Sequence, residues 1–123
     1  MFEIFNQEKQ HLKTIIAGPR NYFNYETLLK AIDCVSWEIT EVVSGNAKGV
    51  DQLGIKWAIE NNIPYKKFPA DWDMYGKAAG MIRNIQMGDY ADALIALWMN
   101  TKGTKNMIEI ANQKGLKTFV YKI

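Results

Sequence analysis

The chain has 123 residues, which suits one domain whose sheet is covered by helices on both faces. Hydrophobic residues make up 48% and charged residues 23% of the chain, as in ordinary globular proteins, and no apolar run is long enough to cross a membrane. The formal net charge of +2 is spread along the chain without a basic stripe. These properties exclude a membrane-spanning protein and argue against nucleic acid as a partner.

Few residues suited to redox or metal chemistry are present. The single cysteine, Cys34, cannot form an internal disulfide, and we expect it to be a small core residue on a helix. The single histidine, His11, lies in a polar leader and is expected at the surface, so neither a metal ion nor a resident cofactor is expected. Because no basic segment followed by an apolar run opens the chain, we expect no secretory signal and a cytoplasmic location.

Strand and helix patterns alternate along the chain from Lys13 onward. Short apolar or β-branched runs predict strands, and apolar residues at helical spacing predict the helices between them. Asn24 is the expected N-cap of the first helix, and Gly115 is the expected stop of the last. The predicted order is strand 13–18, helix 25–35, strand 39–44, helix 49–61, strand 64–68, helix 78–90, strand 92–98, helix 104–113 and strand 117–123.

This alternation predicts right-handed crossovers between parallel strands. We therefore expect an α/β fold, a Rossmann-like three-layer sandwich with a mostly parallel five-stranded sheet. The segment 92–98 is the most continuous apolar run, so it should be a central strand. Residues 1–12 are expected to form an N-terminal arm, and residues 13–123 a single domain.

Glycines and polar residues gather where three of the predicted strands end, the edge at which parallel sheets bind ligands. These segments are 18–20, 44–51 and 98–105. Glycine removes the Cβ that would block a phosphate, and the helix that starts after Gly49 would offer free N–H groups. The segments contain neither the Walker A nor the GxGxxG pattern, and a plain turn with a helix cap explains 44–51 alone about as well.

The joint interpretation of these segments is one anion-binding site. We expect Arg20, Gly45, Gly49, Arg83 and Thr104 to surround the anion, with the arginines making bidentate contacts. A bulky β-branched residue at Gly49 should then abolish ligand binding, at little cost in stability if that loop is exposed.

The stretch 68–87 is unusually rich in aromatic, acidic and small residues. Trp72 and Tyr75 are expected in a loop, where an aromatic ring could stack on a base. A hydrophobic plug over the sheet edge is an equal alternative. Asp71 and Asp73 resemble an acid–base pair but are better explained as residues that cap local turns.

Taken together, five motifs carry a resemblance to a known family. They are G-x-R, S-G-x-A-x-G-V-D, P-A-D-W-x-x-Y-G-x-A-A-G-x-x-R-N-x-x-M, A-D-A-L-I-A-x-W and G-T-x-x-M-I. This order resembles the YspA-like proteins, bacterial and phage domains of unknown function in the SLOG superfamily, and it runs from about Lys13 to Ile123. The resemblance implies a Rossmann-like fold whose pocket takes a nucleotide, an ADP-ribose-like molecule or an NAD-related molecule, as a sensor or a sequestering module.

By position, the resemblance also implies which residues contact the ligand. Asn46 and Trp72 are added to this set from their places in the loops. Asn46 and Lys48 stand where relatives often carry glycine and arginine. The complete set of expected ligand-binding residues is Gly18, Arg20, Ser44, Gly45, Asn46, Ala47, Gly49, Asp51, Trp72, Arg83, Asn84, Gly103 and Thr104.

An enzyme is the alternative that the same superfamily suggests. Lonely Guy enzymes cleave the N-glycosidic bond of nucleoside monophosphates and resemble P-G-G-x-G-T-x-x-E in the last loop. Here the residue three past Thr104 is Met107, and Glu109 comes two residues later, about 200° around a helix. With that glutamate missing, Asp51 or Asp71 is the carboxylate that could replace it, Asp51 and Arg83 are the catalytic candidates, and binding is favoured over hydrolysis.

A homo-oligomer, most simply a dimer, is the expected assembly. Aromatic and methionine residues exceed what so small a core needs, and SLOG relatives commonly pair through helices. The residues behind this expectation are Trp37, Trp57, Met74, Met81 and Met87.

Overall fold

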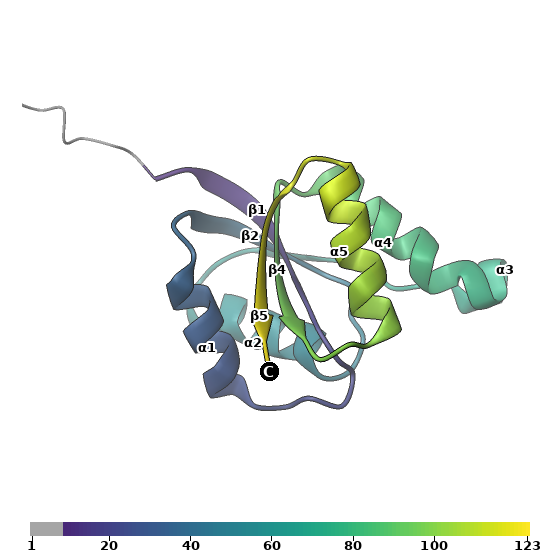
Figure 1. The fold of residues 1–123 in the computed structure, drawn as a ribbon, viewed down its shortest axis with the longest axis horizontal. Coiled ribbons are helices and arrows are strands. Elements are labelled where there is room, and N and C mark those ends of the chain that lie inside the picture. Colours follow the sequence, from purple (N-terminus) through teal and green to yellow (C-terminus); the bar gives the residue numbers. More distant parts are fainter. Residues whose placement is uncertain (1–8) are drawn as a thin grey trace, which may run out of the picture.

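The computed structural model describes residues 9–123, which form a sheet between two pairs of helices, with the short α3 projecting from the start of α4 (Figure 1). The strands are β1 (His11–Ala17), β2 (Glu38–Ser44), β3 (Tyr65–Lys67), β4 (Ala93–Trp98) and β5 (Lys117–Lys122). The helices are α1 (Tyr25–Cys34), α2 (Val50–Glu60), α3 (Trp72–Tyr75), α4 (Ala79–Tyr90) and α5 (Lys102–Gln113), with the 3₁₀ turn η2 (Gly76–Ala78) between α3 and α4.

All five strands run parallel, in the order β3-β2-β1-β4-β5. This confirms the predicted α/β sandwich. β4 lies inside the sheet between β1 and β5, and its residues from Ala93 to Leu97 are buried. Because helices cover β4 on both faces, both sets of its alternating side chains must be apolar, which is why its place in the interior was predictable.

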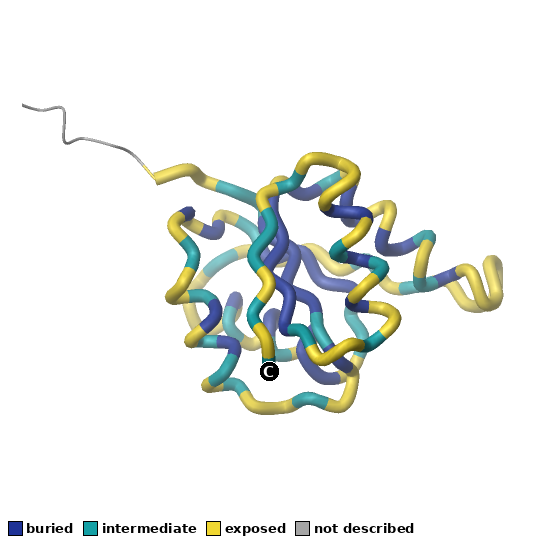
Figure 2. Tube along the Cα trace, viewed as in Figure 1, coloured by how far each residue is buried: buried dark blue, intermediate teal, exposed yellow. Residues whose placement is uncertain are grey.

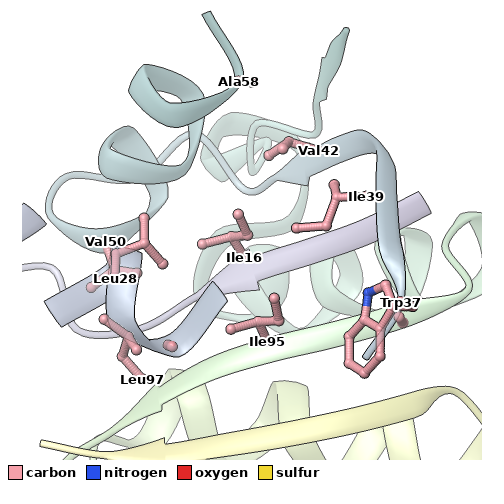
Figure 3. Close-up of a cluster of buried hydrophobic side chains, with 11 residues drawn as sticks. Ile16, Leu28, Trp37, Ile39, Val42, Val50, Ala58, Ile95 and Leu97 are labelled. Atoms are coloured by element: carbon pink, nitrogen blue, oxygen red, sulfur yellow. The ribbon is translucent and has the colours of Figure 1, made fainter. Parts of the chain in front are cut away.

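The two faces of the sheet are covered by different helices. Ile16 of β1 points to the face covered by α1 and α2, where it packs with Leu28 and Val50 (Figure 3). Its neighbour Ile15 points to the opposite face, where residues of α4 and α5 cover it, Met87 among them. Burial accordingly follows the strands and the inner sides of the helices (Figure 2).

Several element ends follow the predicted signals. The Asn24 side chain accepts a hydrogen bond from the Thr27 N–H, 3.3 Å away, and so caps α1 as predicted. Gly115 follows α5 with a φ of +76°, the left-handed conformation that ends a helix. α5 begins at Lys102 and β1 at His11, each two residues before its predicted start. Residues 1–8 of the predicted arm lie outside the described residues.

Two local predictions were wrong. Cys34 is not a core residue: it is the last residue of α1 and is exposed, because it lies on the outer side of this helix, whereas Leu28 and Val35 face the core. Residues 72–78 are not a loop but the short helix α3 followed by the turn η2. The Asp71 side chain accepts from the Met74 N–H, 3.0 Å away, so this carboxylate caps α3, as the turn-cap interpretation predicts.

Two of the five residues behind the dimer expectation belong to the core. Trp37 is 7% and Met87 2% exposed, whereas Met74 and Met81 are 69% and 51% exposed. Surplus aromatic and methionine residues are therefore fewer than the composition indicates. Within residues 9–123, no helix combines the length and the apolar character needed to cross a membrane.

Candidate functional site

The carboxyl ends of β1, β2 and β4 lie side by side, because these strands are neighbours in the sheet. The loops that follow them meet at one edge, the lower edge in Figure 1. There they border a cavity of about 380 Å³, which we call the first cavity. It is lined by Ala17, Gly18, Pro19, Arg20, Asn21, Ala47, Asp51, Arg83, Asn84, Met87, Thr101, Gly103, Thr104 and Met107.

A second cavity of about 520 Å³ adjoins the first and shares Arg20, Ala47 and Arg83 with it. Its other lining residues come from the loop after β2 and from the segment after β3: Gly45, Asn46, Lys48, Pro69, Ala70 and Trp72. All the predicted site residues therefore line at least one of the two cavities, except Ser44 and Gly49.

Arg83 of α4 lines both cavities. It is only 8% exposed. Its Nε donates to the Asn84 side-chain oxygen, 3.0 Å away, and its Nη1 donates to the backbone carbonyls of Gly45 and Phe68. The guanidinium thus ties together the chain segments that follow β2 and β3. Nη2 has no hydrogen-bond partner among residues 9–123 and is not fully buried, and Arg83 lines both cavities.

The charge of Arg83 is not neutralised by an ion pair. No carboxylate of residues 9–123 comes within 4.0 Å of its guanidinium. Burial lowers the pKa of Arg83, the Asp51 carboxylate raises it again, and the nearby Arg20 lowers it. Burying a cation is costly, and the Asp51 carboxylate that offsets the Arg83 charge lies beyond 4.0 Å, so an anion in the cavity would add to this compensation.

Asp51, in the first turn of α2, is 7% exposed and lines the first cavity. Burial raises the pKa of its carboxyl group to about 6, although the hydrogen bond from the Ala47 N–H and the charges of Arg83 and Arg20 lower it. That hydrogen bond is 3.1 Å long. Near neutral pH the Asp51 carboxyl can therefore gain or lose a proton inside the cavity.

The start of α5 supplies hydrogen-bond donors. Thr101, Gly103 and Thr104 line the first cavity, and the Thr101 side chain does not cap the helix but bonds the Thr104 hydroxyl, 2.9 Å away. No acidic residue lies in the first turn. The starts of α1 and α3, by contrast, are capped by Asn24 and Asp71. The N–H groups and the positive dipole end of α5 thus remain available to a ligand.

The start of α2, where the sequence places the phosphate, is occupied by the protein itself. The Val50 N–H donates to the Pro19 carbonyl, 3.2 Å away, and the Asp51 carboxylate lies in the first turn. The condition under which a side chain at Gly49 would cost little stability, an exposed loop, is not met at this residue. Gly49 is buried at a φ of +75°, and a Cβ there would come within 2.6 Å of the Arg20 backbone.

At two other glycines of the site, a side chain would also clash with neighbouring protein atoms. A Cβ at Gly45 would lie 2.8 Å from the guanidinium carbon of Arg83, and one at Gly18 would lie 2.7 Å from the Val50 side chain. Gly103 differs, because a Cβ there would meet no atom within 4 Å. Among these glycines, Gly103 is the one that faces open space.

The remaining predicted residues hold the loops in place. The Ser44 hydroxyl accepts from the Asn46 N–H at 3.1 Å and donates to the Asp51 carbonyl at 3.3 Å. Asn46 has a φ of 60°, so it adopts the left-handed conformation that asparagine tolerates. The Asn84 side chain donates to the Asn106 side chain, 2.9 Å away, and so links α4 to the first turns of α5.

Carboxyl groups are scarce around the cavities. Met107 is buried and lines the first cavity, whereas Glu109 lies in a groove between α4 and α5, beside Lys114. The predicted rotation of Glu109 away from the site is therefore confirmed. Asp51 is the single carboxylic acid among the residues that line the two cavities. Nowhere in residues 9–123 do three His, Cys, Asp or Glu side chains group so as to hold a metal ion.

Some lining residues were missed from the sequence. Thr101 lies within the selected segment 98–105 but was not singled out, and Asn21 lies one residue past the segment 18–20, so the strand-end rule could have found both. Met87 and Met107 come from helices on one face of the sheet, and no local signal shows that their side chains reach a cavity at the sheet edge.

Comparison with known proteins identifies the family. The sequence model of the family described as "YspA, cpYpsA-related SLOG family" matches residues 12–75, more than half of the chain, which include the loops after β1 and β2. The "Gene 61 protein" of Mycobacterium phage D29 is 33% identical over 82 residues, 61% of this chain and 66% of the phage protein, so the chain spans just under two thirds of that relative. No solved structure matches. The chain belongs to the YspA, cpYpsA-related SLOG family.

Proposed function

We propose that the first cavity binds the phosphate of a nucleotide-derived small molecule, and that the protein is a sensor or sequestering module for that molecule. One observation carries the proposal: the buried guanidinium of Arg83 reaches the cavity and has no carboxylate partner within 4.0 Å among residues 9–123. Membership of the SLOG family supports a nucleotide-related ligand.

The uncapped start of α5 is the second part of the proposed phosphate site. Phosphate oxygens would accept from the first-turn N–H groups of Gly103 and Thr104 and from Arg83, which lines the same cavity. Arg20 lines the same cavity and adds a second, exposed cation. Two guanidinium groups and a helix start give an anion charge-assisted hydrogen bonds, which are among the stronger polar contacts in proteins.

Binding without cleavage fits the first cavity better than hydrolysis of an N-glycosidic bond. α5 presents Met107 and no carboxylate to the cavity. One observation favours the hydrolase as a second candidate: Asp51 lines the cavity with a pKa of about 6, suited to moving a proton near neutral pH. We therefore expect AMP, ADP-ribose or NAD to be recovered intact after incubation with the protein, and chromatographic detection of released base would favour the hydrolase.

Gly103 allows the phosphate site to be tested without disturbing the core. Gly103→Asp places a carboxylate at the start of α5, where the space is open and a negative charge favours the helix. The folded protein should be at least as stable, but the carboxylate should repel the phosphate and weaken AMP binding at least about tenfold. Isothermal titration calorimetry with AMP, ADP-ribose and NAD, together with thermal unfolding, measures both effects.

Gly103→Asn is the matched control, because it adds the same shape without the charge. It should bind the nucleotide more tightly than Gly103→Asp does. If the wild type binds one of the three compounds and the aspartate variant binds it equally well, the phosphate lies elsewhere. If the wild type binds none of them, the proposed ligand class is wrong.

A further inference from the structure

The second cavity differs in character from the first. Its walls include the indole of Trp72 and the apolar residues Pro69 and Ala70, facing the loop from Gly45 to Lys48. No carboxylate is among its lining residues. The Trp72 side chain is 51% exposed. A flat, half-exposed aromatic wall is a surface on which a planar aromatic group can stack.

The Trp72 ring is held in position at this wall. Asp71 caps the short helix that carries it, and a Cβ at Gly80 of α4 would lie 3.7 Å from the indole, so the ring rests beside a position that has no side chain. The guanidinium carbon of Arg20 lies 5.8 Å from the centre of the ring. This places a cation near an aromatic face at the border of the two cavities, within the range of a cation–π contact.

The two cavities adjoin at Arg20, Ala47 and Arg83, which line both. Each has a volume typical of a small-molecule site. In a nucleotide one ribose separates the phosphate from the base. A single molecule can therefore place its phosphate in the polar first cavity and its base in the aromatic second cavity.

We infer that the second cavity is the base site, and that the ligands of this protein are nucleoside 5′-phosphates, or larger molecules that contain one, rather than sugar phosphates. The inference rests on the proposed phosphate site. Trp72 provides the stacking face, and Arg20 joins the base site to the phosphate site. Trp72 therefore determines specificity, whereas Arg83 and the start of α5 provide binding of the anion itself.

Comparing the binding of ribose 5-phosphate with that of AMP tests the two sites separately, because these ligands share a phosphate and a ribose and differ in the base. The wild type should bind AMP more tightly than ribose 5-phosphate. Trp72→Ala should weaken AMP binding about tenfold, the loss expected for one stacking contact, and leave ribose 5-phosphate binding unchanged. Trp72→Phe keeps an aromatic face and should retain most of the AMP affinity.

Tyr75→Ala is the matched control, since Tyr75 is an exposed aromatic residue of the same short helix that lines neither cavity. It should leave both affinities unchanged. If Trp72→Ala weakens both ligands equally or neither of them, the base site is refuted. The phosphate site still stands in that case, provided that Gly103→Asp weakens ribose 5-phosphate. If the wild type binds neither compound, both proposals fail.

Discussion

Gly49→Ala should lower the free energy of unfolding by about 3 kcal/mol, which combines the strain of a residue forced into a glycine conformation with the cost of overpacking. Gly49 has a φ of +75° and a ψ of −129°, and its hydrogen atoms face the backbone of Pro19 and Arg20. A Cβ would push the loop after β1 away from the start of α2. Denaturation in urea, followed by circular dichroism, measures the loss.

Gly103→Ala is the control for this prediction. Gly103 lies in the first turn of α5 with open space around it, so a Cβ meets nothing and alanine suits the helix better. Its free energy of unfolding should stay unchanged or rise by about 0.5–1 kcal/mol. Equal stability of the Gly49 and Gly103 variants would show that the two loops are not packed as described.

Asp51→Asn should stabilise the protein by about 3 kcal/mol at pH 8, because raising a carboxyl pKa from 3.8 to about 6 corresponds to that free energy. The folded protein holds the Asp51 proton more tightly than the unfolded chain does. The contribution of Asp51 to the stability of the wild type should therefore fall as the pH rises from about 4 to about 6. An asparagine has no such proton, and its side-chain oxygen can still accept from the Ala47 N–H.

The measurement is urea denaturation of the wild type and the variant between pH 4 and pH 8. The stability difference should be small at pH 4 and reach its full size above pH 7. Asp33→Asn removes the same charge from an exposed position of α1 and should show no comparable pH-dependent difference. A variant that is less stable than the wild type at pH 8 would mean that the ionised Asp51 carboxylate stabilises the fold.

The fold was predictable because its signals are local. Runs such as Ala93–Leu97 must be apolar when helices cover both faces of a strand, and Asn24 and Gly115 mark helix ends by their own backbone chemistry. Cys34 shows the limit of such signals. Cysteine is usually buried, but this preference says nothing about which side of α1 the residue occupies: Cys34 lies on the outer side, while the next residue, Val35, packs against the core.

The position of the two cavities, and so of the candidate site, was also predictable, because the ends of parallel strands meet at one edge. What each glycine of these loops packs against was not predictable from the sequence. Gly18, Gly45 and Gly49 face Val50, Arg83 and the backbone of the loop after β1, and only the packed structure shows that these surfaces touch. The missing ion pair of Arg83 depends likewise on distances between segments far apart in the chain.

A crystal structure of the protein with AMP bound tests the central claim most directly. The phosphate should lie in the first cavity, within hydrogen-bonding distance of the N–H groups of Gly103 and Thr104 and of the Arg83 guanidinium. A phosphate bound instead at the start of α2, or in the groove between α4 and α5, would contradict the proposed site.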